Sequence, residues 1–349
     1  MNHNINVTVA MSGGIDSAVA ALLIRELGYH TTGATMLLCP NNLSVSTDVA
    51  DAKAICDKLS IPHKVYNFEE CFKDTVIKNF IDTYINGGTP NPCVICNKLL
   101  KFGKLLECEL SSGADHIATG HYAQIEKDTN GRYLLKKAAD SKKDQTYMLW
   151  TLSQHQLAHT MFPLGNMTKP EIRGLGAQNG FVNAHKSDSQ DICFVPDGNY
   201  ASFIENRLGS PYPAGDYINE DGVVLGRHKG MIHYTIGQRK GLGISMNKHI
   251  FVINKDAAAN TVTLADEDRL FKNKVVIRRI NLIPFDKLES KMRVEAKIRY
   301  SQASSAAYAE QTGEDEITLT FDEPQRAPAA GQSAVLYDGN YVIGGGFIQ

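Results

Sequence analysis

The sequence predicts an α/β protein with a doubly wound parallel sheet, followed by a small mixed middle domain and a C-terminal antiparallel β-barrel. Strand-like and helical segments alternate through the first half of the chain, as in parallel sheets with crossover helices. A double-glycine turn follows the first strand. Beyond about residue 275 no helical period survives, and short alternating segments with glycine turns are typical of a barrel.

The size of the chain allows three domains. Its 349 residues, 43% of them hydrophobic and 21% charged, have the composition of an ordinary globular protein. We place the domains at residues 1–199, 200–272 and 273–349. No basic leader precedes the first apolar run, and no run approaches membrane-spanning length. We therefore expect a cytoplasmic monomer without a membrane partner.

The elements of the first domain are expected in a fixed order. They are a strand over 5–10, a helix that Gly28 ends, a strand over 32–38, a helix from Thr47 or Asp48 to Leu59, a strand over 63–67, a long helix over 69–85, a helix carrying Leu99, Leu100, Leu105 and Leu106, and a strand before Thr119. Ligands of such sheets bind at the carboxyl ends of the strands. One pocket should therefore gather Ser12, Met36, Gly120 and His121.

The rest of the chain has a different texture. Short alternating segments and glycine turns predict the middle domain near residues 200–271. From residue 275 onward we expect four to six strands, among them segments over 293–300, 317–321 and 333–337.

The turn after the first strand reads Ser12-Gly13-Gly14-Ile15-Asp16-Ser17 and runs directly into a helix. Glycines permit positive φ and close approach to a ligand, Ser17 and Asp16 can cap the helix, and the first helical N–H groups favour an anion. The string is not a Walker A loop. Phosphate is the expected occupant, and a turn without phosphate is the alternative.

Seven cysteines in such a chain point to reduced, metal-bound or catalytic thiols rather than to disulfides. Cys93 and Cys96 form a C-x-x-C motif at the start of a helix, where the dipole favours a thiolate. A structural zinc site is the alternative, but no second C-x-x-C completes it. Cys193 is a third candidate. Core filling is the expected role of the remaining cysteines, Cys39, Cys56, Cys71 and Cys108.

Six motifs carry a resemblance to a known family. SGGIDS alone resembles the PP-loop of the ATP pyrophosphatases, with their adenine nucleotide α-hydrolase-like fold. Together with TPNPCVICNKLLKF, ATGHYA, KDQTYMLW, SDSQDICF and HYTIGQRKGLGI it resembles the tRNA-specific 2-thiouridylase family, which places sulfur on C2 of the wobble uridine of tRNAs of the Lys, Glu and Gln type. The resemblance covers essentially the full length of the chain.

The resemblance implies roles for individual residues. Cys96 is implied as the nucleophile, Cys193 as the persulfide carrier, and Asp16 as a further catalytic residue and a plausible ligand or orienter of Mg²⁺. The implied ATP-binding residues are Ala10, Met11, Ser12, Gly13, Gly14, Ile15, Asp16, Ser17, Met36 and Gly120. The implied tRNA-binding residues are Asn91, Pro92, Cys93, His121, Lys143, Asp144, Gln145, Arg299, Tyr300 and Gln332.

The chemistry of this reaction suits those residues. The C2 oxygen of uridine is a poor leaving group, so it is first adenylated by ATP with release of pyrophosphate, and Mg²⁺ neutralises the phosphates. A Cys193 persulfide then delivers sulfur, and Cys96 closes a disulfide with Cys193 that a reductant reopens. A sulfur-donor protein, either a cysteine desulfurase or a persulfide carrier, is the expected partner besides tRNA.

Cys93 departs from the family pattern, in which many members carry an aspartate. A thiol and a carboxyl group differ too much in pKa for the role to be transferred. Three thiols at Cys93, Cys96 and Cys193 could instead hold a [4Fe-4S] cluster that binds sulfide. The alternatives are thus a cluster-dependent route and a cluster-free persulfide route.

The net charge of −2 is not that of a strongly basic RNA binder, so the surface for tRNA must be local. Two other functions compete with tRNA thiolation. One is a PP-loop enzyme that adenylates a small substrate, and it would need neither Cys96 nor Cys193. The other is a non-enzymatic RNA-binding or zinc-binding protein, and it would not need the glycine loop.

Overall fold

The computed structural model describes residues 4–39, 43–181, 183, 192–244 and 248–349. Its first domain is built on a five-stranded parallel sheet in the order β3-β2-β1-β4-β7. The strands are β1 (Asn6–Ala10), β2 (His30–Leu37), β3 (His63–Asn67), β4 (His116–Ala118) and β7 (Thr160–Met161). The predicted parallel sheet is confirmed.

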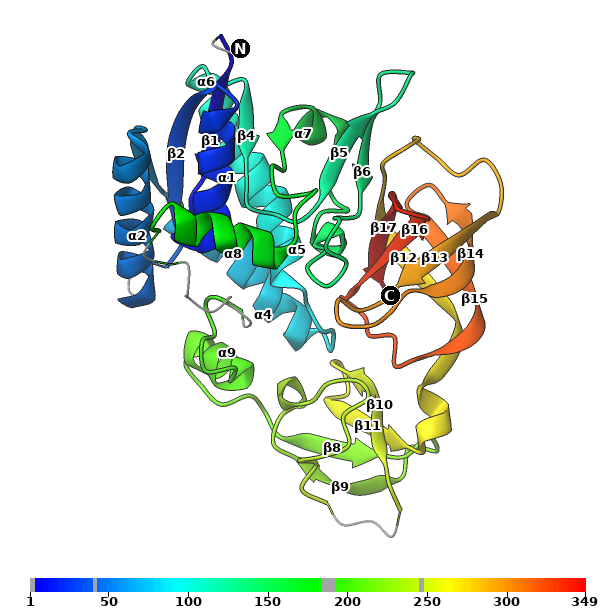
Figure 1. Cartoon of the computed structure of the whole chain (residues 1–349). Coiled ribbons are helices and arrows are strands. Elements are labelled where there is room, and N and C mark those ends of the chain that lie inside the picture. The colour runs from blue at the N-terminus through cyan, green and yellow to red at the C-terminus, as the bar shows by residue number, and fades with distance from the viewer. Residues whose placement is uncertain (1–3, 40–42, 182, 184–191, 245–247) are drawn as a thin grey trace.

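Helices cover both faces of this sheet (Figure 1). One face packs on α1 (Ile15–Glu26), α2 (Leu43–Leu59) and α8 (Lys169–Gln178). The other face packs on a helical layer made of α3 (Glu69–Phe72), η1 (Lys73–Ile77), α4 (Lys78–Ile85), α5 (Pro92–Cys96), η2 (Asn97–Leu105) and α6 (Leu106–Ser111). The sheet is therefore doubly wound, as predicted, because apolar side chains leave it on both sides.

The middle domain holds a small mixed sheet in the order β10-β11-β8-β9, preceded by α9 (Tyr200–Leu208). Its strands are β8 (Gly215–Ile218), β9 (Val224–His228), β10 (Phe251–Asp256) and β11 (Thr261–Ala265), and short 3-10 turns lie at Met231–His233 and Glu267–Leu270. Only the β11–β8 pair is parallel among the pairings of this sheet in the described residues. The predicted mixed domain is confirmed.

Six antiparallel strands form the C-terminal barrel, which closes where β12 pairs with β17. They are β12 (Phe271–Leu282), β13 (Met292–Lys297), β14 (Ser305–Gly313), β15 (Glu316–Arg326), β16 (Ser333–Asp338) and β17 (Tyr341–Ile348). The barrel also extends into the first domain, because Tyr341 of β17 pairs with Lys136 in the hairpin of β5 (Gln124–Lys127) and β6 (Tyr133–Lys136). That connection was not predicted.

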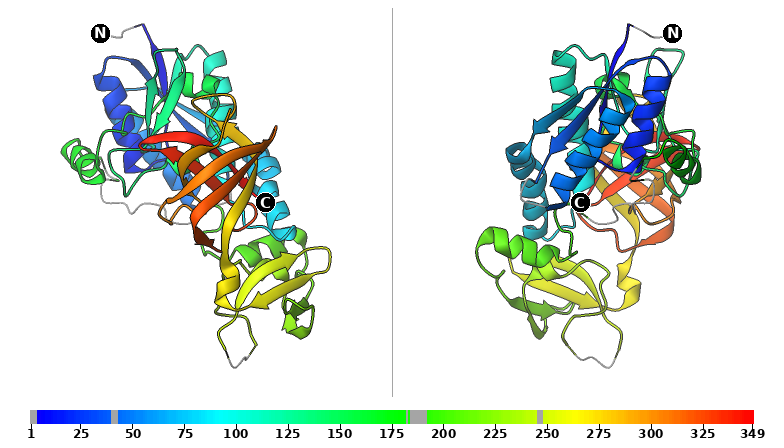
Figure 2. Two further views of the ribbon diagram at one scale, coloured as in Figure 1. Left: turned by 90° about the vertical axis from the view of Figure 1, so that its right-hand side faces the viewer. Right: turned by 60° about the vertical axis from the view of Figure 1, so that its left-hand side comes forward.

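One hydrophobic cluster contains side chains of both the first domain and the barrel. Trp150 is 1% exposed and packs edge-on against Phe347 of β17, with ring centroids 5.3 Å apart. Its indole N–H donates to the Ser333 hydroxyl at 3.0 Å, and the Tyr147 hydroxyl donates to the Ser333 carbonyl at 2.8 Å. Figures 1 and 2 show the barrel beside the first domain, with the middle domain beyond both. The first domain and the barrel are thus in direct side-chain contact around Trp150.

Candidate active site

The glycine loop joins β1 to α1 and is closed by Ser17. The Ser17 hydroxyl accepts from the Ser12 N–H at 3.2 Å and donates to the Gly14 carbonyl at 2.9 Å. Gly13 has φ +74° and needs glycine, whereas Gly14 has φ −88° and does not. Gly14 is the N-cap residue and no side chain caps the helix, so the expectation that Ser17 and Asp16 cap it was wrong. The first amides of α1 thereby stay available to an anion.

Two glycines let neighbouring segments approach the loop. A Cβ on Gly13 would lie 2.5 Å from the Asp48 carbonyl oxygen of α2. A Cβ on Gly120, just beyond β4, would lie 2.7 Å from the carbonyl carbon of Asp16 and 2.8 Å from the Ser17 nitrogen. Gly120 and the loop are therefore in direct contact, although they are about a hundred residues apart in the sequence.

The residues of β1 reach the site through their backbone. Ala10 lies opposite Ala34 in the sheet, the Met11 N–H donates to the Ala34 carbonyl, and the Thr35 hydroxyl donates to the Met11 carbonyl. The Met11 and Ile15 side chains are each 3% exposed and belong to the core. Met36 is half-buried near the end of β2, the strand that pairs with β1, and Ser12 lies just beyond the end of β1.

Asp16 is held by two residues that sequence reasoning missed. Both oxygens of its carboxylate accept from the Lys169 ammonium, at 2.7 and 2.8 Å, and the Tyr122 hydroxyl donates to Oδ1 at 2.8 Å. Asn183 donates from Nδ2 to the Gly13 carbonyl at 2.6 Å, and its buried Oδ1 has no hydrogen-bond partner among the described residues. The sequence signalled the start of α8 through Thr168 and Glu171, but nothing local linked Lys169 to Asp16.

Cys93, Cys96 and Cys193 form a group of thiols that influence one another. Cys93 and Cys193 are exposed and Cys96 is partly exposed. Charge on Cys96 or Cys93 raises the pKa of Cys193, so the three sulfur atoms lie within electrostatic reach of one another. These three thiols are accessible to solvent at their surface, and yet the protein atoms around them desolvate the thiolate. We expect this combination for side chains that line a recess. The motif residues 187–191 that precede Cys193 lie outside the described residues.

The thiols are not activated in the way their position near a helix start predicts. Burial raises the pKa of Cys96 to about 11 and that of Cys193 to about 12, and it also raises the pKa of Cys93. Lys101 acts in the opposite direction on all three. Desolvation of the thiolate is therefore the largest influence on all three pKa values and exceeds that of Lys101.

Cys93, Cys96 and Cys193 are candidate ligands for a metal ion. Within the part of the chain that the structure describes, no group of three or more His, Cys, Asp or Glu side chains is arranged to hold a metal ion. His155 of α7 (Gln154–Ala158) and His159, the residue that follows this helix, have a ligand-like spacing, but the His159 Nδ1 bonds to the His155 carbonyl instead. The donor set of Cys93, Cys96 and Cys193 thus does not fit a bound metal in this conformation.

His121 directly follows Gly120 in the sequence and is partly buried. Its Nδ1 lies 2.7 Å from the Thr119 hydroxyl, and its ring packs against Phe102 and Phe162 with centroids 5.6 and 6.0 Å away. Burial, with a further contribution from the charge of Lys101, holds the pKa of His121 well below its usual range. At neutral pH the imidazole is therefore uncharged.

Several residues that the resemblance assigns to tRNA binding lie around Cys93. Charges on Asp144, Lys143 and Cys93 all affect the pKa of Tyr300, which burial raises, so these residues lie within electrostatic reach of Tyr300, which is 40% exposed. Gln145 bonds to Tyr122 through both its backbone N–H and its side-chain oxygen. Tyr300, which lies between β13 and β14 of the barrel, is thus within electrostatic reach of Cys93 and Lys143 of the first domain.

Three other predicted tRNA residues have structural contacts. The Arg299 guanidinium donates to the carbonyls of Ala327 at 2.7 Å and Ile236 at 3.4 Å, and burial lowers its pKa. Gln332 donates to the carbonyls of Thr89 and Pro90, just before the buried Pro92. Asn91 donates to the Met148 sulfur at 3.4 Å. Arg299 and Gln332 therefore also hold the barrel against its neighbours.

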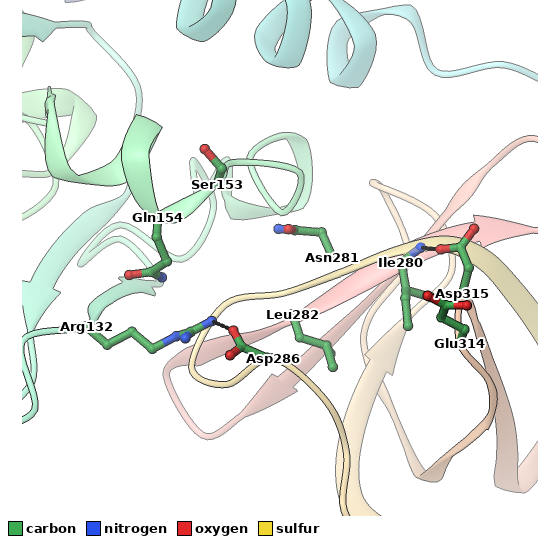
Figure 3. Close-up of a pocket in the computed structure, with 9 residues that line it drawn as sticks. All are labelled: Arg132, Ser153, Gln154, Ile280, Asn281, Leu282, Asp286, Glu314 and Asp315. Carbon is green, nitrogen blue, oxygen red and sulfur yellow. Dashed lines mark hydrogen bonds and ion pairs between the residues drawn. The ribbon is translucent and has the colours of Figure 1, made fainter.

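A separate pocket of about 310 Å³ lies where the β5–β6 hairpin meets the barrel (Figure 3). Arg132 pairs there with Asp286 at 2.9 Å and donates to the Ile283 carbonyl, while Asp315 accepts from the Ile280 N–H. None of the predicted site residues lines it. It belongs to the joint between the two units.

Three family models match the chain end to end. They are described as the tRNA methyl transferase HUP domain over residues 5–197, the tRNA methyl transferase PRC-barrel domain over 201–266, and the aminomethyltransferase beta-barrel domain over 272–348. None of the helices in the described residues is long and apolar enough to span a membrane.

Full-length relatives are similar to the whole chain. The tRNA-specific 2-thiouridylase MnmA of Clostridioides difficile is 46% identical, covering 100% of this chain and 99% of its own. That of Acetivibrio thermocellus is also 46% identical, covering 98% and 99%. Among solved structures, a 4-thiouridine synthetase–RNA complex with bound ATP matches 58% of this chain and 50% of its own, at 16% identity and a TM-score of 0.38. That likeness is too distant to carry an argument.

Proposed function

The chain belongs to the tRNA-specific 2-thiouridylase family, and from that premise we propose how its residues thiolate C2 of the wobble uridine of tRNA with ATP. One observation carries the proposal. Gly120 contacts the proposed phosphate-binding loop at Asp16 and Ser17, and the adjacent His121 is affected by the charge of Lys101, which also affects the thiols of Cys96 and Cys193. A nucleotide and a sulfur carrier can therefore meet at one uridine.

The loop is proposed to hold the triphosphate of ATP. The uncapped amides of α1 and the positive φ of Gly13 support an anion at this place. Mg²⁺ also fits the donor set, because Asp16 offers a carboxylate and Asn183 an amide oxygen that has no hydrogen-bond partner among the described residues. When bound, the ion would neutralise phosphate charge. The half-buried Met36 and Gly120 would flank the adenosine.

Adenylation leaves C2 open to attack by sulfur. The terminal sulfur of a Cys193 persulfide forms a bond to C2, and AMP departs with the electron pair of the C2–O bond. The Cys96 thiolate then attacks the Cys193 sulfur and breaks the sulfur–sulfur bond, so the transferred atom stays on C2 as a thiocarbonyl. A Cys96–Cys193 disulfide results, and a dithiol reductant must reopen it. The electrostatic contact between the two thiols supports this pairing.

The cluster-dependent alternative stays a prediction from the sequence. Because Cys93, Cys96 and Cys193 are not arranged to hold a metal ion in the described conformation, no step is routed through iron. Cys93 is proposed as a neighbour of the target base, next to the exposed ring of Tyr300. The neutral His121 would offer the base a hydrogen bond rather than a charge.

The two competing functions lose their support. A small-substrate enzyme would leave Cys96 and Cys193 without a task, and a non-enzymatic binder would leave the loop without one. A sulfur-donor protein, a cytoplasmic location, a monomeric state and domain limits at 1–199, 200–272 and 273–349 stay proposals.

The test is a thiolation assay with defined components. The protein is incubated with ATP, Mg²⁺, a persulfide donor and unthiolated tRNA, and the digested nucleosides are analysed by mass. We expect 2-thiouridine at the wobble position, with AMP formed in equal amount. Thiolated product without ATP, or AMP release that tRNA does not stimulate, would contradict the proposal.

A further inference from the structure

Lys169 is a lysine that the proposed mechanism has not used. Its side chain is 8% exposed, and its ammonium lies 2.7 and 2.8 Å from the two oxygens of Asp16 in the phosphate-binding loop. Among the described contacts with residues 12–17, it is the only one made by a lysine or arginine side chain. A desolvated cation at an anion-binding loop is costly unless it is paired.

The position of this ammonium is fixed from several sides. Lys169 is the first residue of α8, which a Thr168–Glu171 capping box starts. Its backbone N–H donates to the Asp140 carboxylate at 3.0 Å, and Ile172 one turn later packs in the same core as α1. The ammonium also lies 5.8 Å from the centre of the Tyr122 ring. A long, flexible side chain is thus delivered to the loop by a rigid helix start.

The charge balance of the loop requires a cation once a nucleotide is present. Without ATP, the ammonium of Lys169 already pairs with the carboxylate of Asp16. A triphosphate placed at the amides of α1 brings several negative charges next to Asp16, and like charges in a partly buried site repel strongly. Lys169 is already in place to offset that repulsion while it stays within reach of Asp16.

We propose that Lys169 binds the pyrophosphate end of ATP and bridges it to Asp16, an inference that rests on the proposed function. During adenylation the uridine C2 oxygen forms a bond to the α-phosphorus. The bond from that phosphorus to the bridging oxygen breaks, and its electron pair leaves with pyrophosphate. The Lys169 ammonium donates a hydrogen bond to the oxygens that gain charge and transfers no proton.

The experiment separates this role from simple neutralisation of Asp16. Pyrophosphate binding is measured by calorimetry, and tRNA-dependent AMP release by rate, for the wild type, Lys169→Met, Lys169→Arg and the double variant Lys169→Met with Asp16→Asn. The double variant removes both charges together, so the Asp16 carboxylate is not left without its lysine, and the test stays valid if Lys169→Met alone does not fold. Lys53→Met, which removes an exposed ion pair with Asp57, is the matched control.

We expect pyrophosphate affinity to fall at least about tenfold, and AMP release about 100-fold, in Lys169→Met and in the double variant. Lys169→Arg should keep part of the affinity, and Lys53→Met all of it. A double variant that binds pyrophosphate like the wild type would overturn the inference. If the wild type released no AMP with tRNA, the proposed function would fail instead, while the binding comparison would still decide the role of Lys169.

Discussion

Among single residues, Cys96 and Cys193 combine solvent access with thiols that resist ionisation. Burial raises the pKa of both, and Lys101 only moderates the effect. Neither thiol is therefore a ready nucleophile at neutral pH. Sulfur already carried as a persulfide avoids this problem at Cys193, because the attacking atom is the terminal sulfur and not the cysteine's own.

We expect Cys193→Ser to abolish thiolation and to leave tRNA affinity within about twofold, because the change removes the sulfur carrier without altering charge or size. Nucleoside mass analysis and filter binding measure the two effects. Cys108→Ser, at a partly buried thiol of α6, is the control and should keep full activity. Normal thiolation in Cys193→Ser would remove Cys193 from the mechanism.

Cys93→Ala separates the two sulfur routes. In the persulfide route the variant should keep part of its activity, because only a neighbour of the target base is truncated. In the cluster route, anaerobically prepared wild type should be brown and should use free sulfide, and Cys93→Ala should lose both colour and activity. Absorption spectra and thiolation under iron-free conditions give the answer. Colourless wild-type protein with full activity would exclude the cluster.

Among the elements, the contact between the segment after β4 and the start of α1 places Gly120 under a tight steric constraint. A side chain there must displace the backbone of Asp16 or Ser17, since its Cβ would lie 2.7 Å from the former. Both residues belong to the first turn of α1. Any shift of that turn moves the amides that are proposed to hold phosphate.

We therefore expect Gly120→Ala to suppress AMP release by at least about tenfold while the protein stays folded. Gly174→Ala is the matched control, because Gly174 lies in α8 with nothing within 4 Å of its added Cβ. That substitution should leave AMP release unchanged and raise the free energy of unfolding by about 0.5–1 kcal/mol. Equal AMP release in the two variants would argue against the contact at Gly120.

Individual elements also show how far sequence reasoning reaches. The strand at His63–Asn67 agrees with the strand expected near residues 63–67. The helix starting at Leu43 begins earlier than the predicted Thr47 or Asp48. The six barrel strands agree with the range of four to six. Local pattern determines such elements.

Contacts between distant segments were not predictable in the same way. Lys169 meets Asp16 across 153 positions, and Tyr341 pairs with Lys136 across more than two hundred. No periodicity encodes either pair, because both arise only when whole elements pack. The tRNA-binding roles of Cys93, Lys143 and Tyr300 came from the resemblance and stay a prediction, although Cys93 and Lys143 lie within electrostatic reach of Tyr300.

At the scale of the whole molecule, a buried lysine ties the middle domain to the first. Lys255 of β10 donates to the Tyr234 carbonyl at 3.0 Å and to the Gly88 carbonyl at 3.3 Å, and Gly88 lies shortly before the C-x-x-C helix. Burial lowers the pKa of Lys255 to about 8. The position of the thiol helix thus depends on a contact from another domain.

This pKa predicts a pH dependence of stability. An unfolded lysine has a pKa of about 10.4, so between about pH 8 and pH 10 the unfolded chain binds more protons at Lys255 than the folded chain. Through this group, the free energy of unfolding should rise with pH across that window. Urea unfolding of the wild type and Lys255→Met should show a difference that changes with pH. Lys248→Met, at an exposed lysine, should show none.

The packing of Trp150 has an optical consequence. It is the one tryptophan in the chain, and it lies buried between the first domain and β17 of the barrel. Its emission therefore comes from the joint between these two units and from nowhere else. A red shift of the emission on adding tRNA would mean that water has entered this joint. An unchanged spectrum would mean that the barrel and the first domain stay packed together when tRNA binds. The molecule carries its own spectroscopic probe of whether it opens.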